Sequence, residues 1–329
     1  MTVDVLCLFN LPQLLKKEGY VSRPKVLSGI TGIFLSLFIL FSLLITGGCK
    51  NGAHGREAKR SITIGAKHFT EQDVLGEIMA QLIEAKTGIA VVRKFDLGGT
   101  MVCFDALRTG DIDLYPEYTG TGLVNILKKK TVRDPEKVYQ TVRTDFRKKY
   151  DLLWLKPFGF NNTYTLTMRR KQARSLGIKN ISDIARYKSV LQPGFDAEFL
   201  ERPDGYRGLE RYYGFSFTKA PKQMDPGLMY KALSEGAVDV IDGFATDGRI
   251  RAYGLVTLRD DRHFFPPYYA APLMRAETLK NYPQVGRVLG RLAGAIDEET
   301  MQRMNYEVDG KGKRPSEVAR QFLLSSGLL

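Results

Sequence analysis

Four aromatic residues of this 329-residue chain, Tyr118, Tyr164, Phe244 and Tyr268, fall next to turns or predicted strand ends. The face of an aromatic ring carries negative potential, so several rings around one space form a box for a soft cation. A quaternary ammonium suits such a box best, because it has no N–H to satisfy. Each ring face contributes about 0.5–2 kcal/mol to binding when the cation is desolvated. A single tyrosine of this kind is usually an ordinary half-buried residue. The shared placement of four such residues weakens that interpretation without overturning it.

Lys67, Thr121 and Arg202 are the candidates for contacts with an anion. Lys67 lies three residues before Thr70, the predicted N-cap of a helix, and helix N-termini favour negative charge. Arg202, in the loop sequence ERPDG (201–205), could hold a carboxylate with two parallel hydrogen bonds. Thr121 adds a hydroxyl group. Taken alone, such a lysine and arginine are commonly solvated surface charges.

The elements that position these side chains alternate between strand and helix. Strands are predicted at 61–66, 89–95 and 111–115. The first helix between them has Thr70 as N-cap with Asp73 in capping-box position, and the second covers 101–109. This order predicts a parallel sheet covered by helices. In open parallel sheets, ligands bind outside the carboxyl ends of the strands, where Lys67 and Tyr118 fall.

A second, similar unit is predicted further along, with strands at 189–192 and 237–241. The sequence ALRTGDIDLYPEY (106–118) aligns without gaps with ALSEGAVDVIDGF (232–244), which places Tyr118 and Phe244 at equivalent positions just past a strand. We therefore expect an α/β protein with two lobes and a cleft between them. Lobe 1 covers 61–161 and 265–329, with a helix at 285–304, and lobe 2 covers 162–264. A hinge near 158–163 and 262–268 would let the lobes close around a ligand.

The N-terminal 49 residues have a different character. Residues 26–46 carry no charge and are long enough to cross a bilayer as a helix, and the basic residues before them keep that end in the cytoplasm. Small residues precede Cys49, as in the cleavage site of a bacterial lipoprotein, so Cys49 is a candidate for lipidation. The alternative is an uncleaved anchor. Residues 50–60 are predicted to be a flexible tether, and the rest to lie at the outer face of the cytoplasmic membrane or in the periplasm.

Composition excludes several classes of protein and site. The chain has three cysteines and three histidines, which allows no disulfide framework and none of the common zinc spacings. A net charge of +13 would suggest a nucleic-acid partner, but export argues against one. No metal or cofactor is expected. Cys103 is predicted to be a core residue rather than a nucleophile, and no nucleophile-elbow or phosphate-loop motif is present.

Several collinear segments resemble the substrate-binding proteins of glycine betaine/choline (osmoprotectant) ABC transporters, which have the type II periplasmic-binding-protein fold. The resemblance covers nearly all of 62–329. The segments are IGAKHFTEQ (64–72), LGGTM (97–101), DLYPEYTGT (113–121), ERPDG (201–205), KQMDPGLMY (222–230), TDGR (246–249) and PPY (266–268).

The resemblance implies a receptor that delivers a small zwitterionic or cationic solute to an ABC permease served by a cytoplasmic ATPase. The solute would be glycine betaine or a related betaine, with choline and carnitine as further candidates. Residues at the positions of Tyr118, Tyr164, Phe244 and Tyr268 would cage the trimethylammonium group. Those at Lys67, Thr121 and Arg202 would hold the carboxylate. Phe244 departs from a frequent Tyr, and Asn162 stands where an acidic residue can occur.

Two further interpretations stay open at this stage. The same fold could bind an amino acid, whose primary ammonium needs acceptors such as Asp242 or Asp247. An exported enzyme is the other alternative. We favour betaines over choline, because choline has no carboxylate and would leave Lys67 and Arg202 unpaired in a closing cleft.

Overall fold

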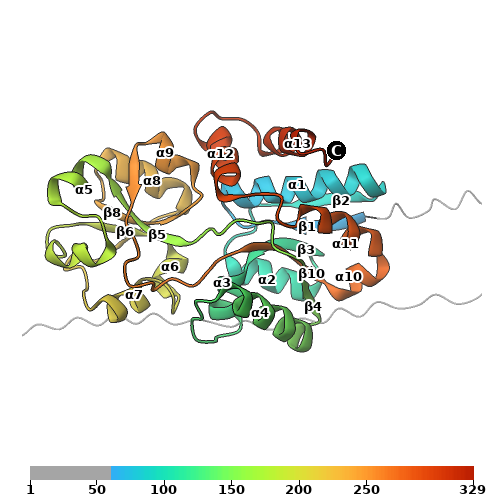
Figure 1. Cartoon of the computed structure of the whole chain (residues 1–329), viewed down its shortest axis with the longest axis horizontal. Coiled ribbons are helices and arrows are strands. Elements are labelled where there is room, and N and C mark those ends of the chain that lie inside the picture. The colour runs from blue at the N-terminus through green and yellow to red at the C-terminus, as the bar shows by residue number, and fades with distance from the viewer. Residues whose placement is uncertain (1–60) are drawn as a thin grey trace, which may run out of the picture. The chain divides into compact units, whose positions relative to one another are not determined.

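The computed structural model describes residues 61–329 of the chain, which form two lobes, each built on a five-stranded sheet (Figure 1). The strand order is β2-β1-β3-β10-β4 in the first lobe and β7-β6-β8-β5-β9 in the second. The predicted anchor, Cys49 and the tether lie outside the described residues. None of the helices between residues 61 and 329 has the length and apolar character needed to span a membrane.

The elements of the two lobes are as follows. The strands of the first sheet are β1 (Ser61–Gly65), β2 (Ala90–Lys94), β3 (Leu114–Tyr118), β4 (Leu152–Trp154) and β10 (Ala270–Arg275). Its helices are α1 (Thr70–Thr87), α2 (Thr100–Thr109), α3 (Thr119–Thr121), the π-helix η1 (Gly122–Ile126), α4 (Pro135–Tyr150), α10 (Ala276–Asn281), α11 (Pro283–Leu289), the 3-10 turn η3 (Gly290–Leu292), α12 (Glu298–Asp309) and α13 (Pro315–Ser325). The strands of the second sheet are β5 (Tyr164–Arg169), β6 (Pro193–Phe195), β7 (Lys222–Gln223), β8 (Val240–Phe244) and β9 (Leu255–Thr257). Its helices are α5 (Arg170–Leu176), the 3-10 helix η2 (Ile181–Arg186), α6 (Ala197–Glu201), α7 (Tyr206–Tyr213), α8 (Pro226–Glu235) and α9 (Gly248–Ala252).

The first sheet is parallel across β2, β1 and β3, as predicted, but β10 joins β3 in the antiparallel direction. The third strand was predicted at 111–115 and instead covers Leu114–Tyr118. Pro116 lies within this strand, opposite Pro272 of β10. Tyr118 is therefore the last residue of β3 rather than a residue beyond it.

The second sheet repeats this arrangement around β8. Gly110 and Gly236 end the helices α2 and α8 with φ angles of 89° and 83°, a left-handed conformation that glycine adopts without strain. Each is followed by a strand whose last residue is Tyr118 in β3 and Phe244 in β8. The predicted equivalence of these two positions is confirmed. The predicted strand at 189–192 is wrong, because β6 begins at Pro193.

Two chain segments, 155–163 and 258–269, connect the sheets. They run side by side: the Asn162 N–H donates to the Tyr268 carbonyl at 3.1 Å, and Asn161 and Tyr269 form an antiparallel bridge. The pairing brings Tyr268 next to the start of β5, which begins at Tyr164.

The C-terminal helices return to the first lobe, where α11, α12 and α13 pack against α1. The prediction of one continuous helix at 285–304 is wrong, because the helix is interrupted between α11 and α12. Helix α12 also packs against α9 of the second lobe. The prediction that Thr70 is the N-cap of α1 is also wrong, because Phe69 takes the cap position. The Thr70 hydroxyl instead donates to Asp309 of α12 at 2.6 Å.

One hydrophobic cluster in the first lobe centres on Phe146 of α4. Its ring centroid lies 5.4 Å from that of Trp154 and 6.0 Å from that of Phe104, both edge-to-face. The Phe146 side chain has no exposed surface. This cluster anchors α4 and η1 to the sheet edge at β4, and so supports the strand ends that carry the site.

We predict that Phe146→Ala lowers the free energy of unfolding by about 3–5 kcal/mol, because it leaves a cavity that the surrounding rings cannot fill. Denaturant titration followed by circular dichroism measures the change. Val102→Ala, at a side chain that is 52% exposed, is the control and should shift the value by less than about 0.5 kcal/mol. Equal effects of the two substitutions would contradict the assigned core.

Candidate functional site

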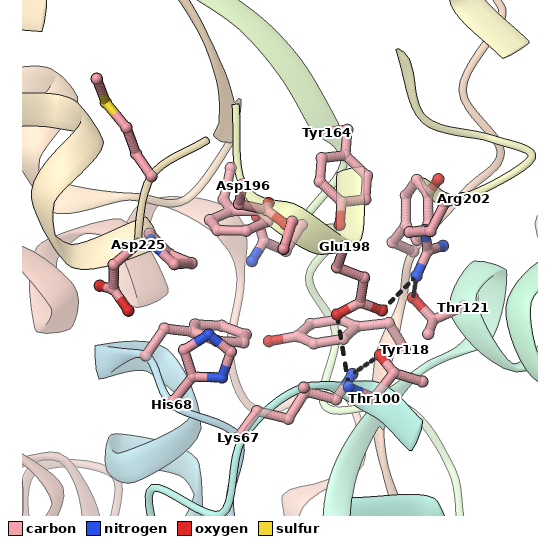
Figure 2. Close-up of a pocket in the computed structure, with 18 of the residues that line it drawn as sticks. Lys67, His68, Thr100, Tyr118, Thr121, Tyr164, Asp196, Glu198, Arg202 and Asp225 are labelled. Carbon is pink, nitrogen blue, oxygen red and sulfur yellow. Dashed lines mark hydrogen bonds and ion pairs between the residues drawn. The ribbon is translucent and has the colours of Figure 1, made fainter. Parts of the chain in front are cut away.

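A cavity of about 450 Å³ lies between the two lobes (Figure 2). Its wall is formed by strand ends, by the start of α2 and by α6, together with the segments that connect the sheets. All seven residues predicted from the sequence to bind a ligand line this cavity: Lys67, Tyr118, Thr121, Tyr164, Arg202, Phe244 and Tyr268.

The aromatic rings of the cavity follow one another in a continuous series. The Tyr164 ring centroid lies 5.4 Å from that of Phe244 and 5.6 Å from that of Tyr268. On the other side of Phe244, the Phe69 ring stacks at 5.4 Å, and Phe69 lies 6.3 Å from Tyr118. Phe69 was not predicted, although its place directly after Lys67 and His68 at the end of β1 could have indicated it. The site thus has five rings contributed by both lobes.

Backbone pairing fixes the positions of these rings. Tyr118 ends β3 opposite Ala270, and Phe244 ends β8 directly opposite Tyr164 of β5. Tyr268 follows two prolines and packs closely on Gly120, where an added Cβ would lie 2.7 Å from the tyrosine ring. Strand register therefore fixes the backbone from which Tyr118, Tyr164 and Phe244 extend.

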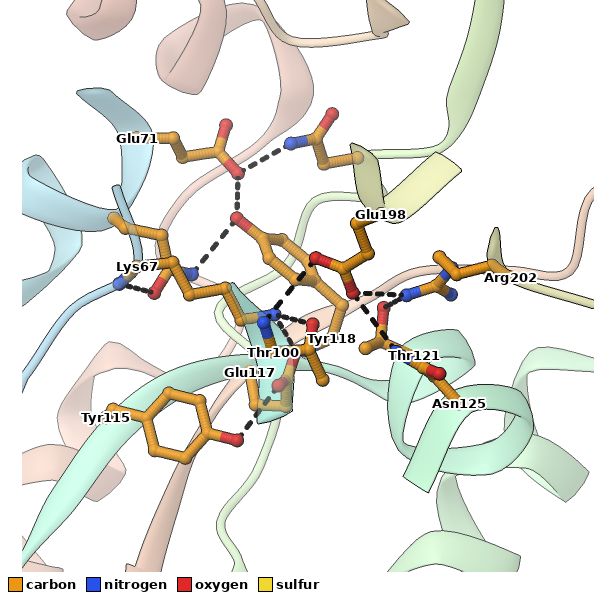
Figure 3. A network of polar contacts seen from close by, with 12 residues as sticks. Lys67, Glu71, Thr100, Tyr115, Glu117, Tyr118, Thr121, Asn125, Glu198 and Arg202 are labelled. Carbon is orange, nitrogen blue, oxygen red and sulfur yellow. Dashed lines mark hydrogen bonds and ion pairs between the residues drawn. The ribbon is translucent and has the colours of Figure 1, made fainter. Parts of the chain in front are cut away.

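Lys67 is already paired within the protein (Figure 3). Its Nζ lies 2.6 Å from Oε1 of Glu117 and donates to the Thr100 hydroxyl at 3.0 Å. Glu117 is fully buried and also accepts from the Tyr115 hydroxyl at 2.9 Å. The ammonium group therefore has a carboxylate partner within the protein.

Arg202 is paired as well. Its Nε and Nη2 donate to the two oxygens of Asp204 at 2.9 and 2.7 Å, and Nη1 donates to Thr121 at 3.3 Å and to Glu198 at 3.1 Å. Burial opposes the charge of Arg202, but Asp204, together with Tyr164, Tyr268 and Glu198, outweighs burial and raises the pKa of the guanidinium. The expectation that choline would leave Lys67 and Arg202 unpaired is therefore wrong, because internal carboxylates satisfy both.

Behind the rings lies a buried carboxylate, Glu71 of α1, which is bonded to the Tyr118 hydroxyl (Figure 3) and accepts four hydrogen bonds in all. The donors are the Tyr118 hydroxyl at 2.7 Å, Asn162 at 2.9 Å, the Thr246 hydroxyl at 2.5 Å and Asn305 at 3.0 Å. Burial raises the pKa of Glu71, and these donors act against that shift. Asn162, where the resemblance allowed an acidic residue, thus donates to an acidic residue from another element. Through Glu71, this network links Tyr118 of the first lobe to Asn162 and Thr246 of the second.

The acceptors proposed for an amino-acid ligand do not line the cavity. Asp242 is fully buried beneath β6, where its Oδ1 accepts from the Asp196 N–H at 3.0 Å. Asp247 pairs with Arg249 at 2.6 Å. That prediction for Asp242 and Asp247 is wrong. The acidic side chains that do line the cavity are Asp196, Glu198 and Asp225, none of which was singled out from the sequence.

Cys103 is buried in α2, as predicted, and burial raises the pKa of its thiol to about 12. A thiol that stays protonated at neutral pH is a poor nucleophile. Among residues 61–329, no group of three or more histidine, cysteine or acidic side chains is arranged to hold a metal ion.

Comparison with known proteins gives a consistent result. Residues 60–325 match the family model described as the substrate binding domain of ABC-type glycine betaine transport system. The carnitine transport binding protein of Listeria monocytogenes is 38% identical over 296 residues, covering 88% of this chain and 96% of that protein. The glycine-betaine-binding protein of Pseudomonas aeruginosa is 37% identical over 289 residues, covering 84% and 91%.

A solved structure agrees with these sequence matches. The crystal structure of a glycine betaine/carnitine/choline ABC transporter chain superposes with a TM-score of 0.68 at 36% identity. It covers 81% of this chain and 99% of the solved one. The two-lobed type II periplasmic-binding-protein fold expected from the sequence is confirmed.

The buried pair Asp196 and Asp242 should make stability depend on pH. Burial, followed by the charge of Asp196, raises the pKa of Asp242 well above its ordinary value. A raised carboxyl pKa stabilises the fold at acidic pH, and this contribution is lost as pH rises through the folded-state pKa. Oδ2 of Asp242 has no hydrogen-bond partner, so the charged form is costly.

We predict that Asp242→Asn gains stability over wild type as pH rises. The difference in free energy of unfolding, variant minus wild type, should be about 1–3 kcal/mol greater at pH 8 than at pH 5. The amide can still accept from the Asp196 N–H and carries no charge. Denaturant titrations at the two pH values test this, with the exposed Asp105→Asn as control, expected to change stability by less than about 0.5 kcal/mol at either pH. A difference in free energy of unfolding between Asp242→Asn and wild type that is the same at pH 5 and pH 8 would refute the prediction.

Proposed function

This chain belongs to the family of substrate-binding domains of ABC-type glycine betaine transport systems, and on that premise we propose that it captures a quaternary-ammonium solute in the cavity between its lobes. The solute is glycine betaine or a related betaine, with carnitine and choline as further candidates. The observation that carries the proposal is the series of five rings, from Tyr118 through Phe69 to Tyr268, around one cavity.

A quaternary ammonium matches this wall better than a primary ammonium does. It offers no N–H, so it needs ring faces rather than acceptors, and its methyl groups bury apolar surface. Tyr118, Tyr164, Phe244 and Tyr268, together with Phe69, supply such faces. Lys67, Thr121 and Arg202, assigned here to the carboxylate end, lie in the same cavity.

Members of this family are solute-binding proteins rather than enzymes, they work outside the cytoplasm, and they deliver solute to permease components. For this chain we take residues 155–163 and 258–269, which link the two sheets, to contain the hinge between lobe 1 (61–161 and 265–329) and lobe 2 (162–264). Closure about this hinge would bring the ring-bearing strand ends onto the solute.

The N-terminal segment completes the proposal. Residues 26–46 would direct export, and either lipidation of Cys49 or an uncleaved anchor would hold the protein at the outer face of the cytoplasmic membrane. The residues from 50 to 60 would then tether the binding lobes near the permease.

We predict that Phe244→Leu weakens binding of glycine betaine by about tenfold, whereas Phe244→Tyr changes it by less than about threefold. Leucine keeps the apolar volume but removes the ring face, and one face is worth about 0.5–2 kcal/mol to a desolvated cation. Phe244 suits the test because no hydrogen bond of the cavity depends on its side chain. Isothermal calorimetry with glycine betaine, carnitine, choline and glutamate measures the affinities.

The two variants form a matched pair at one position. Equal affinities of the leucine and tyrosine variants would show that the Phe244 ring face contributes nothing. Binding of glutamate with no heat from any quaternary ammonium compound would overturn the proposed solute class.

A further inference from the structure

One side chain of the second lobe, Glu198 of α6, reaches across the cavity to the first lobe (Figures 2 and 3). Its Oε1 accepts from the Asn125 amide and from Nη1 of Arg202, both at 3.1 Å. Its Oε2 lies 3.5 Å from the backbone nitrogen of Thr100, the first residue of α2. Asn125 and Thr100 belong to the first lobe, so Glu198 forms a polar contact between the lobes at the cavity wall.

Three carboxylates surround the two cations of the cavity, and Glu198 differs from the other two. The side chains of Glu117 and Asp204 have no exposed surface, and each accepts further hydrogen bonds, from Tyr115 and Tyr268 respectively. Glu198 has 27% of its side chain exposed and lines the cavity. It alone of the three can turn toward water without leaving a buried charge unpaired.

The donors that Glu198 uses are those that a ligand carboxylate would need. They are a guanidinium N–H, a side-chain amide and a backbone N–H at the start of a ten-residue helix. Lys67 is bound to Glu117, and Nε and Nη2 of Arg202 are bound to Asp204. The remaining nitrogen, Nη1 of Arg202, is the cationic donor whose carboxylate partner, Glu198, can move away.

We propose that Glu198 holds the donors that a ligand carboxylate needs, is displaced by that carboxylate, and so sets the preference between zwitterionic and purely cationic quaternary ammonium compounds. The inference rests on the proposed function. A betaine must break the hydrogen bonds of Glu198 and replace them with its own, because two carboxylates cannot share these donors without strong repulsion. Choline leaves Glu198 in place and is attracted by its charge.

The test is Glu198→Gln in the full-length chain, held in detergent, with affinities for glycine betaine and choline measured by calorimetry. Glutamine keeps the size of the side chain and an acceptor for Asn125 and Arg202, but it removes the charge. We expect the ratio of the choline Kd to the glycine betaine Kd to rise about tenfold. Glu201→Gln, at an exposed residue of the same helix, makes the same charge change and should leave the ratio within twofold of wild type.

A ratio that is the same in Glu198→Gln and wild type would overturn the inference, while the proposed function would stand if wild type binds either compound. If wild type binds neither, the proposed function itself fails. Should the variant not fold, the crystal structure of the unmodified protein with glycine betaine decides the question. The inference requires the ligand carboxylate within hydrogen-bond distance of Arg202 and Asn125 with Glu198 turned away, and Glu198 still bound to both would contradict it.

Discussion

Ring faces from two separate sheets must meet around one cavity, and the proposed chemistry of the site depends on this constraint. A methylated nitrogen cannot be oriented by hydrogen bonds, so its recognition requires faces on several sides at once. Tyr118 comes from the end of β3, while Tyr164 and Phe244 come from a paired position of β5 and β8. A solute held by both groups stabilises the contact between the lobes, which links binding to closure.

Charge within the cavity is balanced by the protein itself. Lys67 and Arg202 each have a buried carboxylate partner, so neither is a free cation waiting for an anion. Desolvating an unpaired charge would be costly, and the internal partners avoid that cost. Recognition of a carboxylate then becomes an exchange of partners, in which the more exposed Glu198 is the group that can move. The ring faces attract the quaternary ammonium group. The replacement of Glu198 by a ligand carboxylate affects whether a ligand with or without a carboxylate is preferred.

The sequence was most informative where backbone repetition fixed a position. The aligned segments 106–118 and 232–244 placed Tyr118 and Phe244 correctly as equivalents. The strand bounds were three residues off, because β3 pairs with β10, which comes from a distant part of the chain. Phe69 was missed because a ring at a helix N-cap has no periodic signal. The signal that the sequence did carry was its place directly after Lys67 and His68 at the end of β1.

The pairing of the cations was harder to foresee. Glu117 lies fifty residues from Lys67 along the chain, so only the tertiary fold reveals their contact. For Arg202 the signal was present, since Glu198 lies four residues before it and Asp204 two residues after it. Asp242 shows the opposite case: its place near Phe244 suggested a ligand contact, but it lies two residues before the strand end and is fully buried, where its Oδ1 accepts from the Asp196 N–H.

The most direct test compares glycine betaine with 3,3-dimethylbutanoate, which has the same shape and carboxylate but a neutral carbon in place of the nitrogen. If ring faces bind the positive charge, the carbon analogue should bind at least about 30-fold more weakly, since four faces at the lower end of their range contribute about 2 kcal/mol. Calorimetry or competition with glycine betaine gives the ratio. Equal affinity for the two compounds would show that the cavity recognises only shape and the carboxylate, and would contradict the account.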